Sequence, residues 1–345
     1  MMVLPGHRNR NMKTTVTKRI TVLLLTFAFC LTLFTGCSKS GDGSAYKIAV
    51  VPKLTAASWF ERMESGVKNY NEVHGTDYFY GGPTDTADQA AYLEQLLAED
   101  WDAICVVPFD SESLSPILEK AKREGILIIT HEAASMDPRY FDYDVEAFEA
   151  VDFGENFAKE MIEMTGGEGT YIQFVGSLNS VSHIEWCDSA DRYIQANSDL
   201  QKLGRYETGD DLTSSYNQTK ELLQAHPEIT AIQGCASTDL VGAARAIEEL
   251  GLAGKVALVG TSVASLCKEY ISDGTMSTFS LWDSGEAAKA MLALAEKVLD
   301  EGDAFDPAAC SLSIPGYENM TYRDGVFFGS ARVDVDADNI ADYDF

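Results

Sequence analysis

The sequence predicts an α/β fold in which one chain builds two doubly wound parallel sheets. From residue 46 onward, short apolar runs alternate with amphipathic helical stretches. The runs are four or five residues long and mostly apolar, as expected of strands that helices cover on both faces. The length of 345 residues fits two sheets of about five or six strands better than one of about ten.

The predicted strands follow one another along the chain at Lys47–Val51, Asp77–Tyr80, Ala103–Val107, Ile126–Thr130, Thr170–Phe174, Thr230–Gln233, Val256–Gly260 and Ser277–Leu281. The predicted helices between them are Ala87–Ala98, Leu114–Glu124, Asn156–Met164, Ser215–Ala225, Leu240–Leu250 and Gly285–Asp300. Right-handed crossovers bring the carboxyl ends of such strands to one edge, where open α/β sheets bind ligands. A polar and aromatic stretch at Tyr140–Asp144 is the predicted break between the two sheets.

The N-terminus has the pattern of an export signal. Lys13, Lys18 and Arg19 precede an apolar run over Ile20–Phe34. This run is shorter than the roughly 20 residues that span a bilayer, so it predicts a cleaved signal peptide over residues 1–36. Met12 is an alternative start to Met1.

The apolar run ends in Leu33-Phe34-Thr35-Gly36-Cys37, which resembles a bacterial lipobox. The resemblance implies that Cys37 is diacylated and becomes the mature N-terminus, anchoring the protein to the cell membrane. The polar residues 37–45 are then a flexible tether. The alternative is an ordinary cleaved signal with an incidental Cys37.

The charge of the chain argues against nucleic acid as a partner. The formal net charge is −28, and the first 36 residues hold five basic side chains and no acid. The rest therefore carries −33, which repels phosphate backbones and anionic lipid headgroups. The alternative interpretation of this acidity is solubility alone.

The motifs of common enzymes and metal sites are missing from the sequence. It contains no CxxC, no Cys/His cluster, no Walker motif, no GxGxxG after the first strand, no HExxH and no GxSxG. We therefore expect no metal, no cofactor and no catalytic residue. An enzyme that isomerises or hydrolyses sugars stays the alternative.

Candidate ligand-binding residues follow the first predicted strand. Lys53 is a hydrogen-bond donor just beyond the strand, and Trp59-Phe60 presents two aromatic faces at a helix start. Sugars offer C–H faces that stack on aromatic rings and hydroxyls that hydrogen-bond to charged side chains. In the alternative, Phe60 packs in the core and Trp59 covers a loop.

Further candidates follow later strands. Glu132 could accept hydrogen bonds from two adjacent hydroxyls, although it could equally cap a helix. His183 and Trp186 follow the fifth strand, and Trp282 follows the eighth. Asp239 follows the sixth, where it could simply favour the first turn of the next helix.

These residues resemble those of bacterial periplasmic sugar-binding proteins of the ribose type. The similarity is greatest to the branch that binds autoinducer-2 and rhamnose, and it covers residues 46–345. The matching segments are Ile48–Leu54 with Trp59-Phe60, Gly81–Thr84, Leu281–Asp283 and Asn339–Phe345.

The resemblance implies a type I periplasmic binding protein fold, with two similar lobes joined by three crossings and a ligand in the cleft between them. We expect an N-terminal lobe of residues 46–143 plus 282–311 and a C-terminal lobe of 144–281 plus 312–345. The resemblance also implies that the protein closes on its ligand and delivers it to an ABC transporter permease. We expect a monomer.

The resemblance assigns ligand contacts to individual positions. Lys53, Trp59, Phe60 and Trp282 keep or approximate site residues of the family. Glu132 stands where the family has an aspartate, and Ala236 matches an alanine whose backbone faces the ligand.

Three positions depart from the family pattern. An expected aspartate–glutamine pair reads Ser182-His183, and an expected proline reads Gly234. Losing polar partners changes which ligand is accepted. We therefore expect a pentose, deoxyhexose or polyol, with autoinducer-2, or presentation of the ligand to a sensor kinase or chemoreceptor, as alternatives.

Overall fold

The computed structural model describes residues 46–345. The predicted signal peptide, the tether and the lipidation of Cys37 lie outside the described residues. Within the described part of the chain, no helix combines the length and apolar character needed to cross a bilayer.

The first sheet has seven strands in the order β11-β12-β5-β4-β3-β1-β2. Its strands are β1 (Ile48–Val51), β2 (Phe79–Tyr80), β3 (Ala103–Val106), β4 (Leu127–Thr130), β5 (Tyr143–Glu146), β11 (Thr321–Arg323) and β12 (Val326–Phe328). All neighbours are parallel except β11 and β12. The central strands β1 and β3 are buried throughout, so helices must cover both faces.

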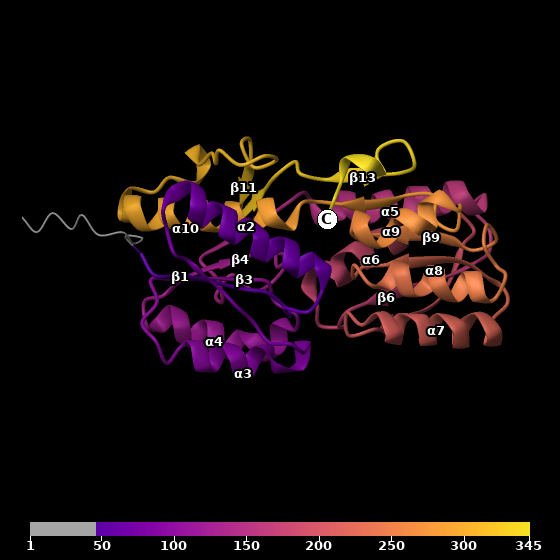
Figure 1. The fold of residues 1–345 in the computed structure, drawn as a ribbon, viewed down its shortest axis with the longest axis horizontal. Helices are drawn as coiled ribbons and strands as arrows, with labels where there is room; N and C mark the ends of the chain where they lie inside the picture. Colours follow the sequence, from indigo (N-terminus) through magenta and orange to yellow (C-terminus); the bar gives the residue numbers. More distant parts are fainter. Residues whose placement is uncertain (1–45) are drawn as a thin grey trace, which may run out of the picture. The chain divides into compact units, whose positions relative to one another are not determined.

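Those helices lie in two pairs on either side of the first sheet (Figure 1). The helices α2 (Ser58–His74) and α10 (Ser284–Glu301) cover one face, and α3 (Gln89–Leu96) and α4 (Ser111–Arg123) cover the other. Gly66 of α2 meets Gly285 of α10 so closely that a Cβ on Gly66 would lie 2.3 Å from the Gly285 carbonyl oxygen. The absence of both side chains lets the two helix backbones touch.

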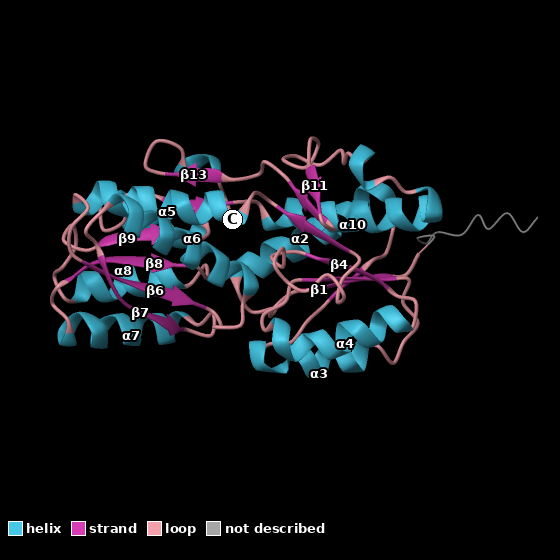
Figure 2. Ribbon diagram, turned by 180° about the vertical axis from the view of Figure 1, so that it is seen from behind, coloured by secondary structure: helices cyan, strands magenta, loops and turns pink. Residues whose placement is uncertain are grey.

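The second sheet has four parallel strands in the order β7-β6-β8-β9. They are β6 (Thr170–Val175), β7 (Gln201–Glu207), β8 (Ile229–Gly234) and β9 (Ala257–Gly260). The helices α5 (Ala150–Thr165) and α6 (Val181–Asn197) pack together, as do α7 (Leu212–Ala225) and α8 (Asp239–Glu249), and α9 (Ala264–Ser272) follows β9. Figure 2 shows the strands of both sheets running between helices.

A two-stranded ribbon continues the second sheet. β10 (Phe279–Leu281) pairs antiparallel with β13 (Val333–Val335) and is bridged to the segment after β9 through Thr261 and Ser280. Short 3₁₀ turns complete the described elements at Thr86–Asp88, Gly302–Ala304, Pro307–Ala309 and Ile340–Asp342.

The described chain passes between the two lobes three times, after β5, after β10 and after β12. The predicted architecture of two doubly wound α/β lobes with three crossings is therefore confirmed. The expected boundaries differ from the structure in two segments. β5 and the β11–β12 hairpin pair within the first sheet, whereas the sequence predicts that residues 144–281 and 312–345 belong to the C-terminal lobe. The buried Val-Phe-Phe strand β12 covers the edge that β5 would otherwise expose.

Candidate ligand-binding site

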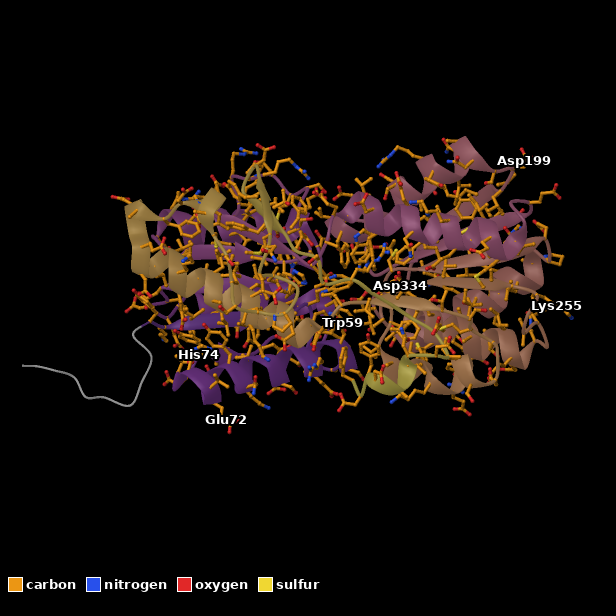
Figure 3. The ribbon with its side chains drawn as sticks, turned by 90° about the horizontal axis from the view of Figure 1, so that it is seen from above. Trp59, Glu72, His74, Asp199, Lys255 and Asp334 are labelled. Carbon is orange, nitrogen blue, oxygen red and sulfur yellow. The ribbon has the colours of Figure 1, made fainter. Side chains whose placement is uncertain are left out.

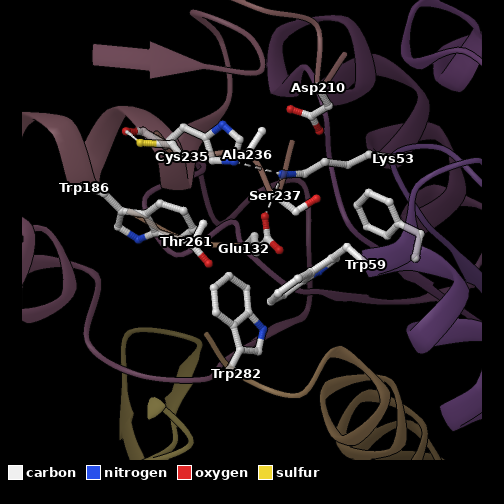
Figure 4. A pocket seen from close by; sticks show the side chains of 12 residues that line it. Lys53, Trp59, Glu132, Trp186, Asp210, Cys235, Ala236, Ser237, Thr261 and Trp282 are labelled. Atoms are coloured by element: carbon white, nitrogen blue, oxygen red, sulfur yellow. Dashed lines mark hydrogen bonds and ion pairs between the residues drawn. The ribbon is translucent and has the colours of Figure 1, made fainter. Parts of the chain in front are cut away.

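A cavity lies where the carboxyl ends of strands from both lobes meet, with about 300 Å³ of empty space inside its rim. This figure includes open solvent at the mouth of the cavity. Figure 4 shows the side chains that line it: Lys53, Trp59, Phe60, Glu132, His183, Trp186, Asp210, Cys235, Ala236, Ser237, Thr261 and Trp282.

The structure brings all seven predicted ligand residues into this one cavity. They come from five parts of the described chain that are far apart in sequence, as the parallel topology requires. Trp59 lies in the interior, only 5% exposed, whereas side chains such as Glu72 and Lys255 lie at the periphery (Figure 3).

A buried ion pair forms the polar centre of the cavity. The Lys53 Nζ donates to a Glu132 carboxylate oxygen at 2.6 Å, and both side chains are at most 5% exposed. Burial acts to lower the pKa of Lys53, but the carboxylates of Glu132 and Asp210 outweigh it and raise the pKa above its ordinary value. Lys53 is therefore a charged donor at neutral pH.

His183 supplies a second donor beside Lys53. Its Nδ1 accepts a hydrogen bond from the Gly176 backbone N–H at 3.0 Å, which assigns the ring hydrogen to Nε2. Burial and the Lys53 charge hold the pKa of His183 well below its ordinary value, so the ring is neutral. The Nε2 atom lies 3.5 Å from Lys53 Nζ, and one ligand oxygen could accept from both groups.

Three tryptophans form the apolar wall. The Trp59 and Trp282 rings lie edge to face with centroids 4.5 Å apart, and Trp186 contacts Trp282 in the same way at 5.8 Å. Trp282 is held in place because its indole N–H donates to His131 Nε2 at 3.1 Å, while His131 Nδ1 bonds to the Val145 carbonyl. The wall offers ring surface to a C–H face of a ligand.

Asp239 shapes the cavity without lining it. Its carboxylate accepts from the backbone N–H groups of Cys235 at 3.1 Å and Ala236 at 2.8 Å and from the Thr208 hydroxyl at 2.7 Å. These bonds fix the turn after β8 and present Ala236 to the cavity. Asp239 thus has the local structural role that the sequence left open.

The positions that depart from the family pattern do not all reach the cavity. His183 lines it, whereas Ser182 is buried beside it and is not one of the lining residues. Gly234 ends β8, where a Cβ would lie 2.8 Å from the Cβ of Asp239. Of the three, His183 is therefore the residue that changes the chemistry of the cavity.

Four lining residues are not among the candidates from the sequence, namely Asp210, Cys235, Ser237 and Thr261, and Trp186 is a candidate to which the resemblance assigns no ligand contact. Trp186 stood out in the sequence as a residue after β6. Ser237 and Thr261 follow β8 and β9, so their position at strand ends was the available signal. Asp210 follows β7, a strand with mostly polar side chains that hydrophobic patterns do not identify.

Neither metal nor redox chemistry is evident in the described residues. Across residues 46–345, no group of three or more His, Cys, Asp or Glu side chains is placed to hold a metal ion. Cys187 and Cys235 are buried thiols with sulfur atoms 3.5 Å apart, and Cys235 borders the cavity. The donors, carboxylates and aromatic rings suit reversible binding of a polar ligand.

Comparison with known proteins agrees with this geometry. A family described as periplasmic binding protein domain matches residues 48–304. A D-ribose/D-allose-binding protein of Pseudomonas aeruginosa is 26% identical over 249 residues, covering 66% of this chain and 74% of that protein.

Solved structures share the fold. LsrB from Clostridium saccharobutylicum in complex with AI-2 superposes with a TM-score of 0.79 and 21% identity, covering 87% of this chain and 100% of that one. An ABC transporter solute-binding protein from Clostridium phytofermentas with bound L-rhamnose superposes with a TM-score of 0.80 and 19% identity. The superposition covers 87% of this chain and 98% of that one.

The match spans most of the chain and contains the strands that position the cavity. The family consists of extracytoplasmic proteins that bind solutes and are not enzymes. With its type I two-lobed fold and its cleft between the lobes, this chain belongs to the periplasmic binding protein family.

Proposed function

We propose that this protein captures a pentose, deoxyhexose or polyol outside the cytoplasm and delivers it to the permease of an ABC importer. The observation that carries the proposal is the pairing, in one cavity, of the buried Lys53–Glu132 pair with a wall of three tryptophans. Hydroxyls of a sugar would bond to the ion pair, while its C–H face would stack on the rings. The sugars in the names of the similar proteins support the same ligand class.

Binding would be coupled to closure of the lobes. The cavity takes its walls from both lobes, so a bound ligand makes its full set of contacts only when the lobes are closed. Such differential contact shifts the population toward the closed state. The three crossings are the segments that would bend, and the closed form is the one a permease would recognise.

We also propose that the protein acts as a monomer anchored through a lipid on Cys37. The support comes from the sequence, in which a basic and apolar segment ends in Thr35-Gly36-Cys37. Labelling of the expressed full-length chain with a radioactive fatty acid tests this, because Cys37→Ala should abolish incorporation. Incorporation that persists in Cys37→Ala would contradict the anchor.

Isothermal titration calorimetry tests the ligand class. The panel is D-ribose, D-xylose, L-rhamnose, D-fucose, xylitol and autoinducer-2, each titrated into the purified protein at pH 7.5. We expect at least one neutral sugar or polyol to bind with a micromolar or lower Kd. If no sugar, polyol or autoinducer-2 binds, the proposed function is overturned. If autoinducer-2 alone binds, the proposed ligand class is wrong and autoinducer-2 is the ligand.

A further inference from the structure

Asp210 is a carboxylate of the cavity wall whose charge helps to keep the buried Lys53 ammonium charged. It follows β7 in a left-handed backbone conformation, with φ at 56°, and it lines the cavity. Its Oδ1 atom is buried and has no hydrogen-bond partner. Buried polar atoms are nearly always paired in folded proteins, so an unpaired carboxylate oxygen calls for an explanation.

The neighbouring residue shows what a structural carboxylate does at this turn. Asp211 caps α7, since its Oδ1 accepts from the Ser214 backbone N–H at 2.7 Å. Asp239, on the other side of the turn, is bonded to two backbone N–H groups and a hydroxyl. The local needs of the backbone are thus met without Asp210.

Gly176 leaves the space that the Asp210 carboxylate occupies. A Cβ built on Gly176 would lie 1.9 Å from Asp210 Oδ1. The same glycine donates its N–H to His183 Nδ1 and so turns the His183 Nε2–H donor toward the cavity. One residue therefore accommodates an acceptor and orients a donor of the same cavity.

The charges around Asp210 set the kind of ligand group it can accept. In Figure 4, the Asp210 and Glu132 carboxylates lie on opposite sides of the Lys53 ammonium. Lys53 is bonded to Glu132 and not to Asp210, so the cavity holds two carboxylates and a single cation. Such a cavity repels an anion and favours a hydrogen-bond donor. Thr261 adds a second buried oxygen without a partner among the lining residues.

We propose that Asp210 accepts a hydrogen bond from a ligand hydroxyl that lies between Asp210 and Lys53, and that it thereby selects uncharged polyhydroxy ligands over sugar acids. This inference rests on the proposed function. Asp210 also borders a second hollow next to Leu54, Thr84 and Leu212, so it lies between this hollow and the cavity.

The test uses Asp210→Asn, which keeps the size of the side chain and its tolerance of left-handed backbone. Asp324→Asn is the matched control, because Asp324 has φ at 53° and is exposed in the turn between β11 and β12. Asp210→Gly, which also accepts this backbone, serves if the asparagine variant does not fold. Calorimetry uses the neutral sugar that the wild type binds most tightly, together with D-galactose, D-fucose and D-galacturonate, which share one ring stereochemistry.

We expect Asp210→Asn to weaken binding of the neutral sugar about tenfold or more, and to lower the preference for the neutral sugar over D-galacturonate by a similar factor. Its melting temperature without ligand should equal or exceed that of the wild type, since a carboxylate whose Oδ1 atom is buried without a hydrogen-bond partner is removed. Asp324→Asn should change neither property.

Unchanged affinity in Asp210→Asn would overturn the inference while leaving the sugar function intact. Weakened binding together with a lowered melting temperature would also overturn it, because it would show a structural role. If the wild type binds none of the sugars, the proposed function is overturned, and so is the inference that rests on it.

Discussion

At the scale of single residues, the cavity contains charges that depend on one another. Lys53 and Glu132 are both almost fully buried, and each neutralises the other at 2.6 Å. Removing one partner of a buried pair leaves an uncompensated charge, whereas replacing both by neutral groups is often tolerated. Replacing Lys53 or Glu132 alone should therefore lower the stability of the fold more than replacing both together.

Lys53→Met should lower the free energy of unfolding by about 3 kcal/mol, as is typical when a buried ion pair loses one member. The double variant Lys53→Met/Glu132→Gln should recover most of that stability and still bind the sugar at least tenfold more weakly than the wild type. Urea unfolding and calorimetry on the same samples measure both effects. Sugar binding at the level of the wild type in the double variant would show that the pair does not contact the ligand.

His183 is the residue at which the cavity leaves the family pattern. His183→Ala removes the Nε2–H donor and leaves the Gly176 N–H without its partner, so both binding and local order should suffer. His183→Asn restores a side-chain acceptor of smaller reach. We expect at least a tenfold loss of affinity in His183→Ala by calorimetry and a smaller loss in His183→Asn, while equal affinity of all three proteins would exclude His183 from ligand contact.

At the scale of elements, the contact between α2 and α10 depends on two glycines. A Cβ on Gly66 would lie 2.3 Å from the Gly285 carbonyl oxygen, which belongs to rigid backbone. Gly66→Ala should therefore destabilise the protein by about 1–3 kcal/mol despite the better helix propensity of alanine, as overpacked cores do. Ser65→Ala, one residue away on the exposed face of α2, is the control. Unfolding in urea should separate the two variants, and equal stability would mean that the helices can move apart freely.

Most of the central strands of the two sheets, and most of the helices that pack on them, could be predicted from the sequence. Buried strands such as β1 and β3 are continuous apolar runs, and helices such as α4 and α10 show a regular apolar face. β7, in contrast, has exposed or half-buried residues only and lies at the edge of its sheet. Edge strands need not be apolar, so periodicity does not reveal them.

The same limit explains which site residues could be predicted. Lys53, Glu132 and Trp282 follow strands that the apolar pattern identifies, and the shared edge of parallel strands then brings them together. Asp210 follows β7, so its place in the cavity could not be inferred. The pairing of β12 with β5 depends on contacts between segments about 180 residues apart, which local patterns do not contain.

At the scale of the whole molecule, burial raises the pKa values of several carboxyl groups, which therefore stay protonated at a higher pH than exposed carboxyl groups do. Burial raises the pKa of Asp210 to about 6 against the opposing charge of Lys53, and it raises the pKa values of Asp239 and Glu160 to about 7. Burial and the neighbouring Asp144 also raise the pKa of Glu146. The folded state therefore binds more protons than the unfolded state between about pH 4 and pH 7. His183, whose pKa is lowered by burial, acts in the opposite sense. So do Asp137, Glu228, Glu249 and Asp273, whose pKa values are lowered by hydrogen bonds, but these carboxyl groups act at the acidic end of the window.

Because the folded state binds the additional protons, stability must fall as the pH rises through that window. The growing negative charge of a chain with a formal net charge of −28 at pH 7 acts in the same direction. We expect the melting temperature without ligand to be highest near pH 5 and to fall by several degrees at pH 8, measured by calorimetry at constant ionic strength. Asp210→Asn should reduce this fall, since it removes one of the titrating groups, and Asp324→Asn should not. A melting temperature that rises from pH 5 to pH 8 would contradict the buried carboxyl groups as the source of the pH dependence.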